Sequence, residues 1–334
     1  MKIWKTLLPL LLTLLAHTAF SAPRDESIQA DLLMTRITGL IQANKQTEAL
    51  PYFEQLEALN MALPESFYYH YIDALDMAGK AEKVFERCEH YMGKYGKRGK
   101  YYAQVLPIYA RAEDAHRAAV AKAEAIARAK EEAKKQAEAA APFLKKLSDE
   151  MVLIPSTEGI PSFYMGQTEV TQGLWEAVMG DNPSLFGYCG SDCPVDNVSW
   201  NDIQQFIKKL NAKTGKTYRL PTVWEWVYAC SAGRRTKYCG SDNLDTVGWY
   251  KVNSGGGTHP VRSKQANAFG LYDMSGNVWE LMDDCAEGNC GKHVMCGGSW
   301  DYEASFMEAR AIGVNRDSSF SGGYIGFRLA RSAP

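Results

Sequence analysis

The sequence predicts a multidomain protein in which a domain of α-helical hairpins is followed by a long alanine-rich helix and then by an α+β domain. Three observations lead to this order. Apolar residues recur at helical spacing in residues 24–110, alanine mixed with charged residues dominates residues 112–141, and glycine and tryptophan are dense in residues 151–332. A chain of 334 residues is long enough for two folded parts and a connector.

The N-terminus has the features of a secretory signal peptide over residues 1–21. Two lysines precede the apolar run Leu7–Ala16, which is too short to span a bilayer comfortably, and Ala19 and Ser21 form a cleavage site before Ala22. Cleavage predicts an exported protein of the periplasm or cell envelope of a bacterium. No cysteine follows the run and no later segment is apolar enough to cross a membrane, so neither a lipoprotein anchor nor a span is expected after cleavage. An uncleaved anchor is the alternative.

The charge of the chain narrows the class of partner. The formal net charge is −2 at pH 7. A near-neutral charge gives no reason to expect nucleic acid or an anionic membrane surface as a partner.

Residues 24–110 are predicted to form helical hairpins similar to tetratricopeptide repeats. Apolar residues recur at helical spacing in four segments, which begin at Leu33, Leu50, Phe67 and Val84. Residues 46–50 superpose on residues 80–84 with an offset near the repeat period of about 34 residues. Five aromatic residues either line a peptide-binding groove or pack one hairpin against the next: Phe67, Tyr68, Tyr69, Tyr71 and Tyr91.

Residues 111–147 are predicted to form a solvated helical spacer. Alanine has the highest intrinsic helix propensity, and Glu131 and Lys135 stand four residues apart on one helix face. Large apolar residues are almost absent, whereas a coiled coil needs a regular apolar seam. The helix is expected to end near Pro142. Because alanine seams are permissive, self-association through this helix stays open.

The eight cysteines fit an oxidising destination. Six of them form three close pairs: Cys189 with Cys193, Cys230 with Cys239, and Cys285 with Cys290. Each pair brackets Gly, Ser or Asn residues that permit a tight reversal, so local disulfides are predicted. Two alternatives stay open, a bond between Cys230 and Cys296 and a zinc site, although the pairs lack the spacing of zinc knuckles. Cys88 is expected to be a buried single cysteine.

Residues 151–332 contain several motif blocks in a fixed order. They are GQTEVTQGLWEAVMG (166–180), PVDNVSWNDIQQFIKKLN (194–211), YRLPTVWEWVYAC (218–230), NAFGLYDMSGNVWEL (267–281), GGSW (297–300) and GFRLA (326–330). In these blocks the chain closely resembles the sulfatase-modifying-factor family, whose founding members are formylglycine-generating enzymes. The resemblance implies a C-type-lectin-like α+β fold with two principal helices. Helical apolar spacing in Gln172–Met179 and Trp200–Leu210 agrees, and Ser199 with Asp202 gives the second helix a polar start.

The catalytic cysteines of that family have no counterpart at the matching positions. Its enzymes carry two cysteines at the third and eighth positions after the GGS and hold Cu(I) between their thiolates; here those positions are Tyr302 and Met307. Tyrosine offers a hard oxygen and methionine a neutral thioether, so neither replaces a thiolate. No catalytic residue and no copper are therefore expected. Cys296 is the one thiol nearby in sequence, and a buried cysteine is more often a small apolar residue than a reactive group.

The resemblance also implies a structural calcium ion in the segment GLYDMSGNVWE. Residue by residue it assigns the Asp273 side chain, the Gly276 and Val278 backbone carbonyls and the Glu280 carboxylate. Hard anionic oxygens and carbonyls of an irregular turn are the ligands that Ca²⁺ prefers. The alternative is that Asp273 caps a turn and Glu280 pairs with an arginine such as Arg328.

Two functions follow from the sequence. The first is a non-catalytic binding or scaffold protein of the bacterial envelope with a protein or peptide partner. The second is a divergent formylglycine-generating oxidase, or another oxidative enzyme, acting on protein cysteine. In either, the resemblance places four residues around the family's substrate groove: Trp300, Tyr302, Met307 and Arg310. The lack of the thiols favours the binding protein.

Overall fold

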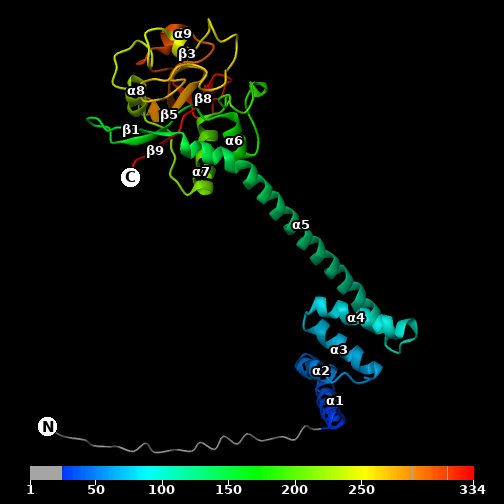
Figure 1. The fold of residues 1–334 in the computed structure, drawn as a ribbon. Helices are drawn as coiled ribbons and strands as arrows, with labels where there is room; N and C mark the ends of the chain where they lie inside the picture. The colour runs from blue at the N-terminus through cyan, green and yellow to red at the C-terminus, as the bar shows by residue number, and fades with distance from the viewer. Residues whose placement is uncertain (1–24, 287–288, 314) are drawn as a thin grey trace, which may run out of the picture. The chain divides into compact units, whose positions relative to one another are not determined.

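The structure is a computed structural model that describes residues 25–286, 289–313 and 315–334 (Figure 1). Its contacts divide the chain into two compact units, Met1–Ala129 and Lys130–Pro334. The predicted signal peptide lies outside the described residues. Within those residues, no helix has the length and apolarity needed to cross a membrane.

The first unit is α-helical, as the apolar spacing predicts. Its helices are α1 (Glu26–Gln42), α2 (Leu50–Glu57), α3 (Glu65–Met77), α4 (Ala81–Tyr95) and the first part of α5 (Tyr102–Asp149). The periodic apolar residues of these helices form one buried cluster. Phe53 stacks on Tyr71 with ring centroids 5.0 Å apart, and Tyr69 stacks on Tyr101 at 4.6 Å. The aromatic residues therefore pack helix against helix, which is one of the two alternatives that the sequence left open.

Helix α5 is longer than the predicted spacer. It begins at Tyr102 and continues through Pro142 to Asp149, whereas the sequence predicted an end near Pro142. Proline removes one helical hydrogen bond and disfavours the helix interior. Leu147 is buried in the core of the second unit and Phe143 packs against it. Tertiary packing of this last segment offsets the local penalty of the proline.

The second unit combines helices and short strands. Its helices are α6 (Gln172–Met179), α7 (Trp200–Thr214), α8 (Val223–Ser231) and α9 (Leu244–Val247). Its strands are β1 (Met151–Ile154), β2 (Phe163–Gly166), β3 (Gly248–Trp249), β4 (Ser275–Gly276), β5 (Trp279–Ala286), β6 (Asn289–Cys296), β7 (Arg316–Asp317), β8 (Ile325–Gly326) and β9 (Ala330–Ser332). They pair in the orders β1-β2-β9, β3-β4 and β7-β6-β5-β8. This unit is α+β, as predicted.

Local sequence signals explain where the main helices of this unit begin. The Ser199 hydroxyl accepts a hydrogen bond from the backbone of Asp202, and the Asp202 carboxylate accepts one from the backbone of Ser199. Thr222 and Glu225 form the same reciprocal arrangement at the start of α8. Each capping box satisfies backbone donors that a helix start leaves free.

Strand β5 separates two hydrophobic cores. Successive side chains of a strand point to opposite faces. Trp279 and Leu281 belong to the core that α6 and α7 also line, whereas Met282 belongs to the core that contains Trp226 of α8. Glu280 lies between Trp279 and Leu281 in sequence and shares the face of Met282, where it contacts Trp226. A charged residue is thereby placed inside an apolar layer.

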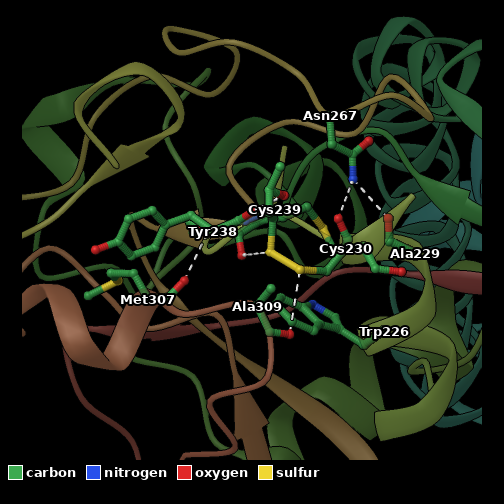
Figure 2. The surroundings of a disulfide bond; sticks show 12 residues. Trp226, Ala229, Cys230, Tyr238, Cys239, Asn267, Met307 and Ala309 are labelled. Atoms are coloured by element: carbon green, nitrogen blue, oxygen red, sulfur yellow. Dashed lines mark hydrogen bonds between the residues drawn. A yellow bond between two sulfur atoms is a disulfide. The ribbon is translucent and has the colours of Figure 1, made fainter. Parts of the chain in front are cut away.

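The three predicted disulfides are present: Cys189–Cys193, Cys230–Cys239 and Cys285–Cys290. Cys88 and Cys296 are free and buried, so the alternative bond between Cys230 and Cys296 is not formed. Figure 2 shows the Cys230–Cys239 bond at the end of α8. Beside it the Asn267 side chain donates hydrogen bonds to the carbonyls of Ala229 (2.8 Å) and Cys230 (3.2 Å). The end of this helix is therefore tied to the nearby segment of Cys239 and to the more distant segment of Asn267.

Candidate functional site

The loop that precedes β5 has an irregular backbone. Asp273, Gly276 and Asn277 have φ values of 55°, 92° and 63°. This left-handed region is open to glycine and is tolerated by Asp and Asn. At Gly276 a Cβ atom would collide with the backbone of Trp249 on the paired strand β3. Glycine is required there, and the turn brings Asp273 and Glu280 into the same interior.

Glu280 forms a buried ion pair with Arg328. The Arg328 Nη2 lies 2.7 Å from Glu280 Oε1, and the two side chains are 0% and 1% exposed. The Trp226 Nε1 donates to Glu280 Oε2 at 2.7 Å. Arg328 also donates to the carbonyls of Gly166 and Tyr272. Both charges are paired and hydrogen-bonded, which is the condition under which buried ions are tolerated.

Asp273 is buried with one oxygen unpaired. Its Oδ2 accepts a hydrogen bond from the backbone N–H of Arg262 at 2.8 Å, whereas its Oδ1 has no hydrogen-bond partner among the described residues. The residue is 2% exposed. Burial raises the pKa of the Asp273 carboxyl to about 6, against the backbone bond from Arg262 and the charge of Arg328, which lower it. A buried carboxylate oxygen without a hydrogen-bond partner favours the protonated form or the binding of a cation.

Glu169 is a third carboxylate of this interior and was missed in the sequence. It accepts hydrogen bonds from Asn277 Nδ2 (3.1 Å) and from the backbone of Val278 (3.3 Å). Burial first, then the charges of Asp273 and Glu280, raise the pKa of Glu169 well above its usual value. The sequence offered one signal for it: Glu169 is an acidic residue inside the motif block of residues 166–180.

These three carboxylates lie near the buried guanidinium of Arg328, and the charge of the partly exposed Arg262 also acts on Asp273. The interior therefore holds more acidic than basic groups, and the free Asp273 Oδ1 and the hydrogen-bonded Glu169 suit a hard divalent cation. Glu280 fits less well as a ligand because its oxygens already accept from Arg328 and Trp226. No group of three His, Cys, Asp or Glu side chains in the described part of the chain is arranged to hold a metal ion. A site here would depend on backbone carbonyls, and Gly276 and Val278 are the predicted ones.

Tyr302 and Met307, where the family resemblance predicts the catalytic cysteines of related enzymes, have packed side chains. Met307 is 0% exposed and lies in a small core with Tyr238, Leu244 and Val247. Tyr302 is half-buried, with ring centroids 5.4 Å from Trp279 and 5.2 Å from Phe306. Burial, followed by the nearby Tyr324, raises the pKa of the Tyr302 phenol. Neither side chain offers an anionic ligand or nucleophile at neutral pH.

The four predicted groove residues have different surroundings. Met307 is buried, and the Trp300 Nε1 donates to the Gly323 carbonyl at 2.9 Å while its ring packs edge-on against Phe186. Arg310 is exposed and lines a different cleft, beside α8. The groove that the family resemblance assigns to these four residues stays a prediction.

Cys296 is not a reactive thiol in this arrangement. It lies on β6 opposite Glu280 and is 0% exposed. Burial, then the charges of Glu280 and Asp284, raise the pKa of this thiol far above its ordinary value. The thiol stays protonated at neutral pH, whereas the thiolate is the nucleophile and metal ligand.

Comparison with known proteins agrees with the motif blocks. The family described as "Sulfatase-modifying factor enzyme 1-like domain" matches residues 127–333. Chaperone protein LppX of Paenibacillus barcinonensis is 32% identical over 230 residues, covering 52% of this chain and 81% of that protein. The formylglycine-generating enzyme of Streptomyces coelicolor is 30% identical over 174 residues, covering 42% of this chain and 53% of the enzyme. The chain thus spans about half the length of that enzyme.

One solved structure extends the comparison. Treponema denticola variable protein 1 matches with a TM-score of 0.48 and 30% sequence identity, covering 52% of this chain and 85% of that chain.

Proposed function

This chain belongs to the sulfatase-modifying factor enzyme 1-like domain family, and we propose that it is a non-catalytic member that binds an envelope protein or peptide. The observation that carries the proposal is the state of Tyr302 and Met307. Both are packed into cores, and neither can act as a thiolate. The remaining thiol nearby in sequence, Cys296, is buried.

Two further observations support a binding role outside the cytoplasm. Three disulfides are typical of a chain that folds in an oxidising compartment, which agrees with the predicted signal peptide. The similarity to Chaperone protein LppX supports a role in holding another protein, because a chaperone acts by binding. The proposed location is the periplasm or cell envelope of a bacterium.

The proposed architecture is a tetratricopeptide-like module and a C-type-lectin-like module on either side of a helical spacer. The helices α1 to α4 bury their apolar faces against one another, and the α+β unit has its own cores. Each module then offers a surface of its own.

The proposed cofactor is a structural calcium ion. Asp273 and Glu169 would hold it together with the Gly276 and Val278 carbonyls, and its charge would neutralise the acidic surplus of that interior. Its role would be to stabilise the irregular loop before β5.

The experiment that tests the function is an oxidation assay on the purified mature protein. Cu(I), oxygen and a sulfatase-type CxPxR peptide are supplied, and mass spectrometry measures conversion of the peptide cysteine to formylglycine. An active formylglycine-generating enzyme is the positive control. No conversion by folded, calcium-loaded protein is expected, and envelope pull-downs then identify the partner.

Turnover of that peptide would overturn the proposal and establish the oxidase alternative. The Cys296→Ser variant then shows whether this thiol takes part. Loss of turnover with an unchanged unfolding temperature would assign it a redox role. On the binding proposal, the same variant retains partner binding.

A further inference from the structure

A large cleft lies beside α8. Its volume is about 670 Å³, within the usual range of ligand pockets. One wall is formed by residues of α8, including Trp224 and Tyr228, and another by Glu308, Ala309 and Arg310. The segment after α8 and Ile160 line the rest. The cleft is far larger than a water site, so it can accept a ligand of several residues.

The lining of this cleft is strongly basic in a chain whose net charge is negative. It contains four cationic residues, Arg234, Arg235, Lys237 and Arg310, and one carboxylate, that of Glu308. Lys237 lies 3.7 Å from Glu308. The three arginines form no ion pair with any residue that the structure describes. Their donors are free for a ligand, and arginine binds carboxylates through two parallel hydrogen bonds.

The same cleft has an apolar side. Trp224 is 72% exposed although it is the largest side-chain type, and Ile160, Val227 and Ala309 line the wall near it. The neighbouring tryptophan of the same helix, Trp226, is 1% exposed. An indole held on a helix and turned to solvent is a ready contact for an apolar or aromatic group, because its area is removed from water on binding.

The basic loop is held in place before any ligand binds. The Cys230–Cys239 disulfide closes the loop of residues 231–238 at its two ends. Figure 2 shows Ala309 next to this disulfide, with the Cys230 Sγ 3.7 Å from the Ala309 carbonyl. The backbone N–H of Ala309 donates to the carbonyl of Lys237 at 3.0 Å, which joins the loop to the opposite wall. A fixed loop loses less conformational entropy on binding than a free one.

From these features we infer that the cleft beside α8 binds an acidic peptide segment, with its carboxylates on Arg234, Arg235 and Arg310 and an apolar side chain on Trp224. The inference rests on the proposed binding function and names the chemistry of its ligand. A peptide is favoured over a polyanionic saccharide or nucleic acid because one side of the cleft is apolar. Carboxylates and an aliphatic side chain in one short segment match both sides of the cleft.

The test uses a fluorescently labelled pentapeptide with the order Glu, Asp, Leu, Asp, Glu and its neutral counterpart Gln, Asn, Leu, Asn, Gln. Fluorescence anisotropy measures binding to the full mature chain. The acidic peptide is expected to bind at least about tenfold more tightly, a difference of about 1.4 kcal/mol, and to weaken at high salt because exposed charges are screened.

Matched variants locate the binding. Arg234→Gln combined with Arg235→Gln is expected to weaken the acidic peptide by about tenfold or more. Lys208→Gln combined with Lys209→Gln removes the same charge from exposed positions of α7 and is expected to change binding by less than about twofold. Trp224→Ala is expected to weaken binding several-fold, whereas Tyr188→Ala, which removes a side chain that is 83% exposed, leaves it unchanged. All four residues or pairs are exposed, so the unfolding temperature should stay constant.

Several outcomes overturn the inference. Equal binding of the acidic and neutral peptides removes the anionic ligand, and equal weakening by the lysine pair shows that only overall charge matters. Tighter binding of a heparin-type oligosaccharide in the same cleft replaces the peptide by a saccharide. If the acidic peptide fails while the oxidation assay is negative and pull-downs recover a partner, the cleft inference alone fails. If the oxidation assay is positive, the proposed function itself fails.

Discussion

Asp273 and Glu280 stand seven residues apart around one loop and are both buried, yet their surroundings differ. The Glu280 carboxylate pairs with the Arg328 guanidinium and accepts a hydrogen bond from the indole N–H of Trp226. Asp273 meets one backbone N–H and keeps an unpaired oxygen, with Glu169 as an acidic neighbour. The first carboxylate is neutralised by the protein itself. The second has no hydrogen-bond partner on its Oδ1 among the described residues.

The difference distinguishes a buried charge that is paired within the protein from one whose stability depends on a bound proton or cation. A fully paired buried ion contributes little net stability, but its partner becomes very unfavourable when it is left alone. An incompletely paired carboxylate destabilises the fold while it is charged, and anything that binds it stabilises the fold. Substitutions at Glu280 and Asp273 should therefore respond differently to calcium and to pH, and an exposed ion pair should contribute less than either.

The largest effect is expected for Glu280→Gln. It removes the charge of the one carboxylate that is hydrogen-bonded to the buried Arg328 guanidinium among the described residues, so the free energy of unfolding should fall by about 3–5 kcal/mol. Denaturant unfolding should give the same loss in calcium and in chelator. The double variant Glu280→Gln with Arg328→Met should recover a large part of it. A loss that appears only in calcium would make Glu280 a metal ligand instead.

A smaller effect, with a sign that depends on the metal, is expected for Asp273→Asn. In chelator at neutral pH the substitution removes an uncompensated buried charge, so the free energy of unfolding should rise by about 2 kcal/mol. In calcium it removes a ligand, so the variant should lose the stabilisation that the metal provides to the wild type. Thermal unfolding in the two buffers measures both. Equal destabilisation in both buffers would contradict the calcium site.

The free energy of unfolding of the wild type should depend on pH through the titration of Asp273. The pKa of Asp273 is about 6 in the folded chain, so the folded state binds more protons than the unfolded state between the two pKa values. In chelator this group's contribution is fully present at acid pH and is lost as pH rises through about 6, by about 1 kcal/mol between pH 5 and pH 7.

Two comparisons isolate the contribution of Asp273 to the free energy of unfolding. His293, whose pKa burial lowers, acts in the opposite direction because it resists protonation in the folded state. The difference between wild type and Asp273→Asn at each pH removes the His293 contribution. Calcium should reduce the pH dependence that Asp273 contributes, because it holds the carboxylate ionised. A difference that does not change with pH would show that Asp273 titrates normally.

The smallest effect is expected for an exposed pair. Lys251 lies 2.8 Å from Glu303, and the two side chains are 55% and 60% exposed. Lys251→Ala should therefore change the free energy of unfolding by no more than about 1 kcal/mol, and the change should vanish at high salt. A loss as large as that of Glu280→Gln would show that burial does not account for the contrast.

Local structure was predictable where the signal lies within a few residues. Helix α6 has the predicted bounds, the Ser199–Asp202 cap forms, and the three close cysteine pairs are bonded. In each case the partners are near in sequence, so local geometry suffices. The end of α5 was not predictable, because packing of Phe143 and Leu147 on the second unit outweighs the proline.

By itself the sequence determined the family, the order of the two folded parts and the three local disulfides. Only the tertiary structure decided how the charges are partnered. Glu169 reaches Val278 across 109 positions, and Arg328 reaches Glu280 across 48. It also decided that Arg310 lines the cleft beside α8 while Met307 is buried in a core. The reason is physical: burial energies and pKa values depend on which groups meet in space, and residue spacing along the chain carries little of that information.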